Sequence, residues 1–414
     1  MNQVRVGIEA INAYCGVARI SARTLFDARG LDSSRFANLM AVQRSVQMPW
    51  EDPVTNAVNA ARPVLESSDR GAKDIELLIT STESGVDYSK SVASYVHTHL
   101  GLSRHCRMME VKQACYGATG ALQLAAGLLS ATTNPDARAL IIATDVNPMD
   151  ERARYAEPTT GHGAVAVLVG REPAVLALDA GAYGLYGFEV MDTARPTPDF
   201  DLYNAELSLL SYLECLVESY RAYQAKVPDS DFISSFDHLV MHTPFGGMVR
   251  AAHRKMMREF GQATPAMVQE DFDRRLSPSL TYGREVGNLC SGSLYLSLLS
   301  LLDSAPGQVR AGARIGLFAY GSGCASEFFS GTLGPAAAER SASGLLADRL
   351  LRRRELSFAE YEHLVPQARD CIVPRRHHEV DMSSWAETLK PFDSDGPLLV
   401  LERIDEHHRK YAWR

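Results

Sequence analysis

The stretches 114–122 (ACYGATGAL) and 287–295 (GNLCSGSLY) decide the fold when one is placed above the other. Small residues line up near the start of both, and each continues into an apolar helical pattern that ends in a Leu-Leu pair. The alignment places Cys115 and Asn288 at the same position, just before a helix. The pattern favours a duplicated chain, although helices rich in small residues resemble one another in many α/β proteins.

Short apolar runs on either side of these stretches predict the strands of two halves. The first half carries them at 4–8, 75–80, 139–144 and 163–169. The second half carries matching runs at 238–242, 314–320 and 397–402, the last as the counterpart of 163–169. Strands that alternate with helices indicate an α/β protein with a largely parallel sheet.

We therefore expect two halves, residues 1–170 and 171–414. The second half would include an insertion at about 171–235, with an exposed amphipathic helix at 212–226, and an extension from about 332. In that extension Ser357 and Glu360 are spaced as in a capping box, which predicts a helix that begins near Phe358. Ligand sites favour the carboxyl ends of strands, so the matching strand-to-helix junctions should meet at one site.

Composition limits the classes of function. The 50 acidic and 42 basic side chains give a net charge of -8, which argues against nucleic acid as the main partner. No apolar run approaches the roughly 20 residues that span a bilayer, and the start of the chain shows no signal-peptide pattern. Seven cysteines without a CxxC pair argue against a disulfide framework or structural zinc site, and we expect a reducing cytoplasm.

Two residues of the first half could carry chemistry. Cys115 precedes a predicted helix, where unpaired N–H groups and the helix dipole favour a thiolate, so a lowered thiol pKa is expected. A buried structural cysteine is the alternative. Glu83 directly follows the strand at 75–80, where a carboxylate acts either as a helix cap or as a catalytic base.

His242 and Ser322 hold comparable places in the second half. His242 ends the strand that matches 76–80, opposite Glu83 on the duplicated framework, whereas a lone histidine there is more often structural. Ser322 lies in the turn 320–324 (YGSGC). Such a turn either offers backbone N–H donors to an anionic oxygen or is only tight.

Arginines recur on one predicted helix, and histidines pair elsewhere. Arg250, Arg254 and Arg258 are spaced i, i+4 and i+8, so they share a face of a helix at 249–260. A solvated face is the ordinary interpretation, and a docking site for an acidic partner or a phosphate is the other. The histidines of 97–99 (HTH) lack a carboxylate or cysteine to complete a ligand set, so we expect no metal site.

Together these motifs resemble those of the 3-hydroxy-3-methylglutaryl-CoA synthase family and occur in its order. They are 82–87 (TESGVD), 112–116 (KQACY), 242–245 (HTPF), 287–295 and 320–323 (YGSG). The stretches 6–10 (VGIEA) and 49–55 (PWEDPVT) resemble one branch more closely. That branch belongs to bacterial polyketide pathways and installs β-branches on chains bound to carrier proteins.

The resemblance implies a thiolase-like αβαβα five-layer fold, usually in a homodimer, and a catalytic triad of Glu83, Cys115 and His242. It also implies that Asn288 and Ser322 contact the acyl groups. The enzyme would be an acyltransferase with donor and acceptor acyl carrier proteins as partners. It would need no metal or redox cofactor, because the phosphopantetheine arm or CoA only carries the substrate.

Two positions depart from the family pattern. Gly247 stands where the metabolic enzymes commonly have a lysine near CoA, which favours a carrier protein over free CoA. A tyrosine that the family often places after the strand at 139–144 has no clear match, since Tyr155 lies in a different context.

Three alternatives stay open at this point. They are a synthase of isoprenoid metabolism that uses free CoA esters, a ketoacyl synthase III-like condensing enzyme, and a catalytically silent scaffold that binds carrier proteins. Glu83 separates the condensing enzyme from the synthase, because decarboxylative condensation needs no such base. A degradative thiolase would want a second catalytic cysteine; Cys290 and Cys324 are available, but their surroundings match the synthase motifs.

Overall fold

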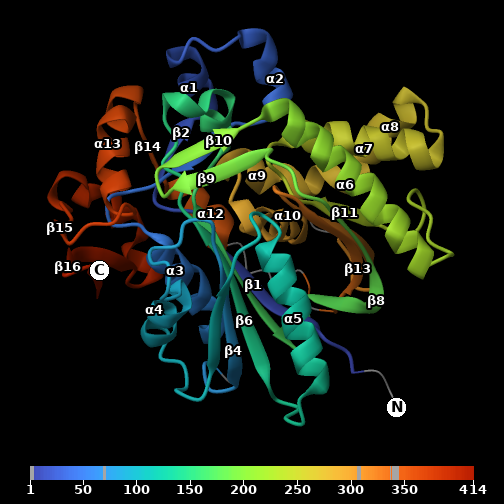
Figure 1. The fold of residues 1–414 in the computed structure, drawn as a ribbon, viewed down its shortest axis with the longest axis horizontal. Helices are drawn as coiled ribbons and strands as arrows, with labels where there is room; N and C mark the ends of the chain where they lie inside the picture. The colour runs from blue at the N-terminus through green and yellow to red at the C-terminus, as the bar shows by residue number, and fades with distance from the viewer. Residues whose placement is uncertain (1–3, 69–70, 305–308, 336, 338–344) are drawn as a thin grey trace.

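The computed structural model describes residues 4–68, 71–304, 309–335, 337 and 345–414 (Figure 1). Its main sheet has the strand order β11-β12-β13-β8-β1-β7-β6-β4-β5. The first-half strands are β1 (Gly7–Tyr14), β4 (Ile75–Ser81), β5 (Arg107–Val111), β6 (Arg138–Asp145) and β7 (Gly163–Gly170). The second-half strands are β8 (Leu176–Gly187), β11 (His238–Met241), β12 (Arg314–Gly321) and β13 (Ala325–Leu333). The two halves join where Gly7 and Ile8 of β1 pair with Ala177 and Leu176 of β8.

Helices cover both faces of each half. The outer helices of the first half are α3 (Pro53–Glu66) and α4 (Val92–His99), those of the second half are α6 (Ala205–Lys226) and α7 (Gly246–Gly261), and α5 (Gly117–Ala131) and α10 (Ser293–Leu302) lie between the halves. Side chains alternate across the strands accordingly. On β6, Ile141 packs with α5 and α10, whereas its neighbour Ile142 packs with α3. The described residues thus form the five αβαβα layers that we predicted.

The sheet is mixed, so the prediction of a largely parallel sheet is wrong. β4 runs parallel to β5 and β6, and β11 runs parallel to β12. β7 and β13 run antiparallel to the strands before them. The short turn between β12 and β13 cannot carry the crossover that a parallel pair requires.

The predicted counterpart of β7 is also wrong. Residues 397–402 overlap with β16 (Leu399–Asp405), which pairs with β15 (His377–Glu379) and β17 (His408–Trp413) in a separate sheet. The position that matches β7 belongs to β13, which returns antiparallel beside β12. An apolar run predicts a buried strand but does not indicate which other strand it pairs with.

Much of the predicted insertion at about 171–235 belongs to the layers. β8 pairs with β13, and α6 packs on β8 and β13. Only the hairpin of β9 (Thr193–Thr197) and β10 (Phe200–Tyr203) forms a sheet of its own there. The helix expected at 212–226 exists but is not an exposed one, because Tyr212 and Tyr223 are buried and their hydroxyls bond to the His242 carbonyl and to Ser330. The division near residue 170 stays a prediction.

The C-terminal extension packs against the first half, as Figure 1 shows for the red segment beside α3 and α4. It contains α12 (Leu345–Arg352), β14 (Arg354–Glu355) and α13 (Phe358–Asp370). The predicted start of α13 is confirmed, with reciprocal capping between Ser357 and Glu360. β14 adds to β2 (Ala18–Ser21) and β3 (Gln43–Val46). Short helices complete the fold: α1 (Ala22–Ala28), α2 (Phe36–Leu39), α8 (Pro265–Asp271) and α9 (Thr281–Val286).

Among the described residues, no helix combines the length and the apolar character that crossing a membrane requires.

Candidate active site

The duplicated junctions place the predicted residues at comparable ends of strands. Glu83 follows β4 and His242 follows β11, whereas Cys115 lies between β5 and the start of α5. Asn288 lies just before the short 3-10 turn that leads into α10, and Ser322 lies in the turn between β12 and β13. Because α5 and α10 share the central layer, their starts bring residues from both halves together.

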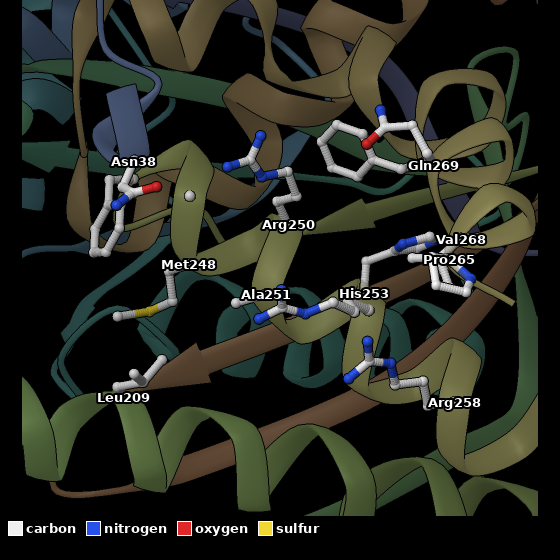
Figure 2. Close-up of a pocket in the computed structure, with 14 residues that line it drawn as sticks. Asn38, Leu209, Met248, Arg250, Ala251, His253, Arg258, Pro265, Val268 and Gln269 are labelled. Atoms are coloured by element: carbon white, nitrogen blue, oxygen red, sulfur yellow. The ribbon is translucent and has the colours of Figure 1, made fainter. Parts of the chain in front are cut away.

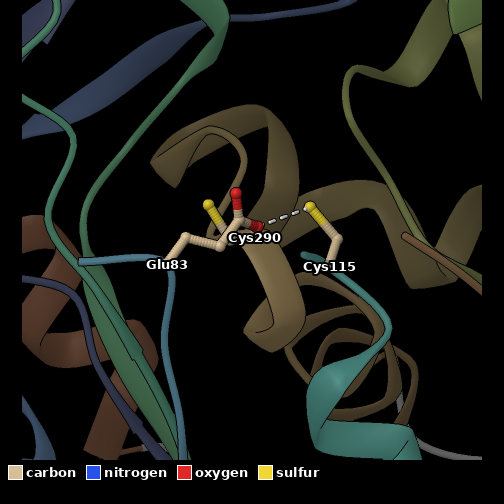
Figure 3. Close-up of side chains that lie close together, drawn as sticks. All are labelled: Glu83, Cys115 and Cys290. Carbon is tan, nitrogen blue, oxygen red and sulfur yellow. Dashed lines mark hydrogen bonds between the residues drawn. The ribbon is translucent and has the colours of Figure 1, made fainter. Parts of the chain in front are cut away.

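Cys115 and Glu83 are in direct contact. The Cys115 thiol donates a hydrogen bond to Glu83 Oε1, with 3.2 Å between sulfur and oxygen (Figure 3). A hydrogen bond with Cys290 lowers the pKa of the thiol, but burial and the negative charge of Glu83 raise it more, to about 12. The resting Cys115 side chain is therefore a thiol beside a carboxylate.

The expected lowering of the thiol pKa is consequently wrong. α5 begins at Gly117, so Cys115 lies outside the first helical turn, where the dipole acts most strongly. A carboxylate at hydrogen-bond distance opposes formation of a second negative charge more strongly than the helix end favours it.

Asp145 holds the turn that carries Glu83. Its Oδ1 accepts hydrogen bonds from the Glu83 backbone N–H at 2.7 Å, from Ser84 Oγ at 2.8 Å and from Thr82 Oγ1 at 3.1 Å. Burial and the neighbouring Glu83 charge raise the pKa of Asp145 to about 7. We did not single out Asp145 from the sequence, although its place at the end of β6, beside β4, was the available signal.

Arg195 reaches the same turn from β9. Its guanidinium donates to Ser84 Oγ at 3.0 Å and to the Glu83 carbonyl at 3.3 Å, and it pairs with Asp201 at 2.7 Å. No spacing in the sequence indicated this residue, because β9 lies in a segment that we read as an insertion.

His242 is buried, and its ring lies beside that of Tyr320. The ring centroids are 6.4 Å apart, and the His242 backbone N–H donates to the Phe318 carbonyl at 2.8 Å. Burial lowers the pKa of His242 to about 3, so the resting imidazole is neutral. In the part of the chain that the structure describes, its Nδ1 has no hydrogen-bond partner.

The turn of Ser322 packs against the loop of Cys115. A Cβ atom at Gly321 would lie 2.5 Å from the Gln113 carbonyl oxygen and from the Tyr116 nitrogen, so only glycine permits this approach. Asp192 stabilises the turn by accepting hydrogen bonds from the Tyr320 hydroxyl at 2.7 Å and the Gly323 N–H at 3.0 Å.

Asn288 organises the second junction. Its Oδ1 accepts hydrogen bonds from the Cys290 backbone N–H at 3.0 Å and Ser293 Oγ at 2.7 Å, and its own N–H donates to the Thr159 carbonyl at 2.8 Å. These bonds fix the side-chain oxygen and the backbone of Asn288. They also direct Cys290, which we had set aside, into the site: one donor atom each from Glu83, Cys115 and Cys290 lie within 4.8 Å of one another.

The three arginines line a separate pocket of about 550 Å³ on α7 (Figure 2). The predicted helix is confirmed, and Arg250, Arg254 and Arg258 are exposed, with no ion pair to any described residue. Apolar side chains such as Met248 and Val268 form much of the remaining lining, which also includes Asn38, His253 and Gln269. Basic groups around an apolar hollow can receive an acidic partner that also carries apolar side chains.

Gly247 lies in the wall of this pocket. A Cβ atom there would collide with the carbonyl oxygen of Asn38, at the end of α2. The backbone therefore leaves no room for the lysine that the metabolic enzymes commonly carry at this position.

Comparison with known proteins gives the same family at both ends of the chain. The model for the hydroxymethylglutaryl-coenzyme A synthase N terminal matches residues 3–174, and that for the C terminal matches residues 257–414. Over 99% of both chains, the protein is 43% identical to the polyketide biosynthesis 3-hydroxy-3-methylglutaryl-ACP synthase PksG of Bacillus subtilis. It is 35% identical to the hydroxymethylglutaryl-CoA synthase of Enterococcus faecalis, over 89% of this chain and 93% of that one.

Among solved structures, the HMG synthase of the curacin biosynthetic pathway, in complex with holo donor-ACP, superposes with a TM-score of 0.95. It is 46% identical, and the match covers 99% of this chain and 100% of that one. The five-layer arrangement is thus the thiolase-like fold of these synthases. With a family match at each end, and relatives that align along nearly its whole length, this chain belongs to the hydroxymethylglutaryl-CoA synthase family.

Proposed function

We propose that this protein is a β-branching synthase of polyketide biosynthesis. It condenses an acetyl group, delivered by a donor carrier protein, with the β-keto group of a carrier-bound polyketide chain. The contact between Cys115 and Glu83 carries the proposal, since it sets a nucleophile beside a base. The similarity to PksG and to the curacin synthase supports the choice of pathway.

In the first stage the Cys115 sulfur attacks the acetyl thioester of the donor. The thiol is neutral at rest, and Glu83 Oε1, 3.2 Å away, is the acceptor in reach of its proton. The pantetheine thiolate leaves and takes up a proton. Acetyl-Cys115 remains a thioester, which keeps the protons of its methyl group acidic enough to remove.

In the second stage Glu83, ionised again, removes a proton from that methyl group. Backbone N–H groups beside Cys115 stabilise the enolate oxygen, and one such donor can be worth about 3 kcal/mol. The enolate carbon attacks the β-ketone of the acceptor chain. Burial keeps His242 neutral at rest. As negative charge develops on the ketone oxygen, the ring takes up one proton from solvent and passes it to the alkoxide, while the proton that Glu83 removed returns to solvent.

In the third stage water hydrolyses the thioester to Cys115. The product carries a carboxymethyl branch beside a tertiary hydroxyl and stays tethered to its own carrier. Asn288 and Ser322, from the two junctions of the second half, would contact the acyl groups during these steps. The proposed reaction uses no metal or redox cofactor, because the phosphopantetheine arm serves only to carry substrate.

We assign donor and acceptor carrier proteins as partners. The curacin synthase has been crystallised with its donor ACP, and the arginine face of α7 offers this chain a basic surface despite its net charge of -8. We further propose a homodimer, since β5 ends the strand order and exposes Met108 at the sheet edge, where a second copy could pair. Seven free cysteines fit a cytoplasmic location.

Intact-protein mass spectrometry tests the function, with acetyl-carrier protein and acetyl-CoA offered in separate reactions and Cys115→Ser as the control. Rapid acetylation from the carrier alone is expected. Acetylation from CoA alone would favour the isoprenoid enzyme, and none from either would favour the silent scaffold. Condensation that survives Glu83→Ala would favour the ketoacyl synthase III-like reaction.

A further inference from the structure

The proposed reaction leaves one buried thiol of the site without a task. Cys290 is 5% exposed and follows Asn288 by two residues. One donor atom each of Cys290, Cys115 and Glu83 lie within 4.8 Å of one another. Figure 3 shows the Glu83 carboxylate between the two sulfur atoms in this view. Two thiols and a carboxylate, brought together from three separate segments, form a set of metal donors.

We propose that Cys115, Cys290 and Glu83 bind a thiophilic divalent cation, Zn²⁺ or Cd²⁺, and that the bound ion blocks acylation of Cys115. The block rests on the proposed role of Cys115 as nucleophile, whereas the binding does not. The ion is thus an inhibitor of the site and takes no part in the reaction.

The separations suit zinc. Bonds of about 2.3 Å to sulfur and about 2.0 Å to oxygen place the ligands of a tetrahedral ion roughly 3.5 Å apart. The 3.2 Å between the Cys115 sulfur and Glu83 Oε1 is close to that spacing. The other donor separations do not exceed 4.8 Å, so they would have to close by roughly 1 Å at most. Cys115 and Glu83 are half-buried, which leaves solvent access for entry of the ion and for water as a fourth ligand.

The ligand types select the metal. Thiolates prefer soft or borderline ions, so Zn²⁺ and Cd²⁺ should bind well and Mg²⁺ poorly. Each thiol gives up its proton to solvent when its sulfur binds the ion. Coordination draws electron density from the Cys115 sulfur to the ion and so weakens its attack on a thioester, which explains the expected inhibition.

The surroundings favour a positive ion. Asp145 is buried beside Glu83, and among the described residues its Oδ2 has no hydrogen-bond partner. Arg195 is the nearby cation, but Asp201 pairs with it at 2.7 Å. Hydrogen bonds fix both the backbone and the side chain of Cys290. Its backbone N–H donates to Asn288 Oδ1 at 3.0 Å, and its thiol lies 3.7 Å from Asn147 Oδ1.

The test is titration of the full-length, reduced protein with Cd²⁺, followed by the ultraviolet charge-transfer absorption of cadmium thiolates and by calorimetry. Wild type should bind one ion at this site with the absorption of two thiolates. Cys290→Ser and Cys290→Ala should lose half of that absorption and at least tenfold in affinity. Cys106→Ser, which removes a buried thiol that does not belong to this cluster, should bind like wild type. Affinity equal to wild type in both Cys290 variants, with circular dichroism unchanged, would overturn the proposal.

A second measurement separates this proposal from the proposed function. Zn²⁺ should slow acetylation of Cys115 by acetyl-carrier protein at least tenfold in wild type and much less in Cys290→Ser, and Mg²⁺ should have no effect. If Cys115 is not acetylated even without zinc, the proposed function fails while the cadmium absorption still reports the site. Acetylation at full rate with Cd²⁺ bound would overturn the inhibitory part.

Discussion

Two regions of the molecule differ in how far their charged groups are exposed to water. One is the contact between Cys115 and Glu83, and the other is the arginine face of α7, formed by Arg250, Arg254 and Arg258. At the contact, burial and a neighbouring carboxylate keep the thiol neutral. On α7, Arg250, Arg254 and Arg258 lie in water and pair with no described residue. A charge in a partly buried site controls chemistry over a few ångströms, whereas a solvated charge acts weakly and is screened by salt. Substitutions should therefore have large effects at the first region and small, salt-dependent effects at the second.

The largest effect is expected from Glu83→Gln. This variant keeps the size of the side chain but removes the base, so condensation should fall about a thousandfold. Acetylation of Cys115 loses its proton acceptor but should persist through the thiolate, because the pKa of the thiol falls once the carboxylate charge is gone. For the same reason, alkylation of the thiol by iodoacetamide at pH 7 should become faster. Single-turnover condensation and the alkylation rate measure the two outcomes; slower alkylation would contradict the assigned electrostatics.

The second effect concerns pH. Because the pKa of Cys115 is raised to about 12, the thiolate fraction should grow about tenfold for each pH unit between pH 7 and pH 9. Alkylation of Cys115 by iodoacetamide should therefore rise about a hundredfold over this range. The rate is followed by mass spectrometry, with Cys115→Ser to identify the labelled site. A rate that levels off below pH 8 would indicate a lowered thiol pKa, as first expected from the helix end.

A smaller effect is expected from Asp145→Asn. The amide can still accept a hydrogen bond from the Glu83 N–H, but the charge that raises the thiol pKa and holds the turn is lost. Condensation should fall about tenfold, while KM for the acetyl donor changes little, because Asp145 acts through Glu83. The pH profile of condensation should also lose any step near pH 7, where Asp145 titrates. An unchanged condensation rate and pH profile would show that Asp145 has no role in the reaction.

The smallest effect is expected from Arg258→Glu on α7. KM for acetyl-carrier protein should rise several-fold at low salt and approach the wild-type value at high salt, because solvated charges are screened. Turnover of a small acetyl thioester should not change. Arg403→Glu, on β16, makes the same change of charge in an exposed residue away from the pocket and serves as the control. An equal loss of activity with acetyl-carrier protein and with the small thioester would show that the arginine face does not dock the carrier.

The strands and the main helices were predictable because they follow from local patterns, whereas the catalytic set of Glu83, Cys115 and His242 came from the family resemblance and stays a prediction. The apolar runs gave the buried strands, and Ser357 with Glu360 marked the start of α13. The pairing partner of each strand was harder to predict from the sequence. The run at 397–402 resembles β7 in its residues but pairs in another sheet. The exposure expected for the helix at 212–226 was also wrong, because the hydroxyls of Tyr212 and Tyr223 bond to buried groups distant in sequence.

The sequence by itself determined which residues stand at the ends of strands and the starts of helices, because those features depend on neighbours along the chain. It thereby placed Cys115 before α5 and Glu83 after β4. Only the tertiary structure decided that Asp145 and Cys290 join them and that the thiol pKa rises rather than falls. Burial and Coulomb interactions depend on groups distant in sequence, so no local pattern could have shown their balance.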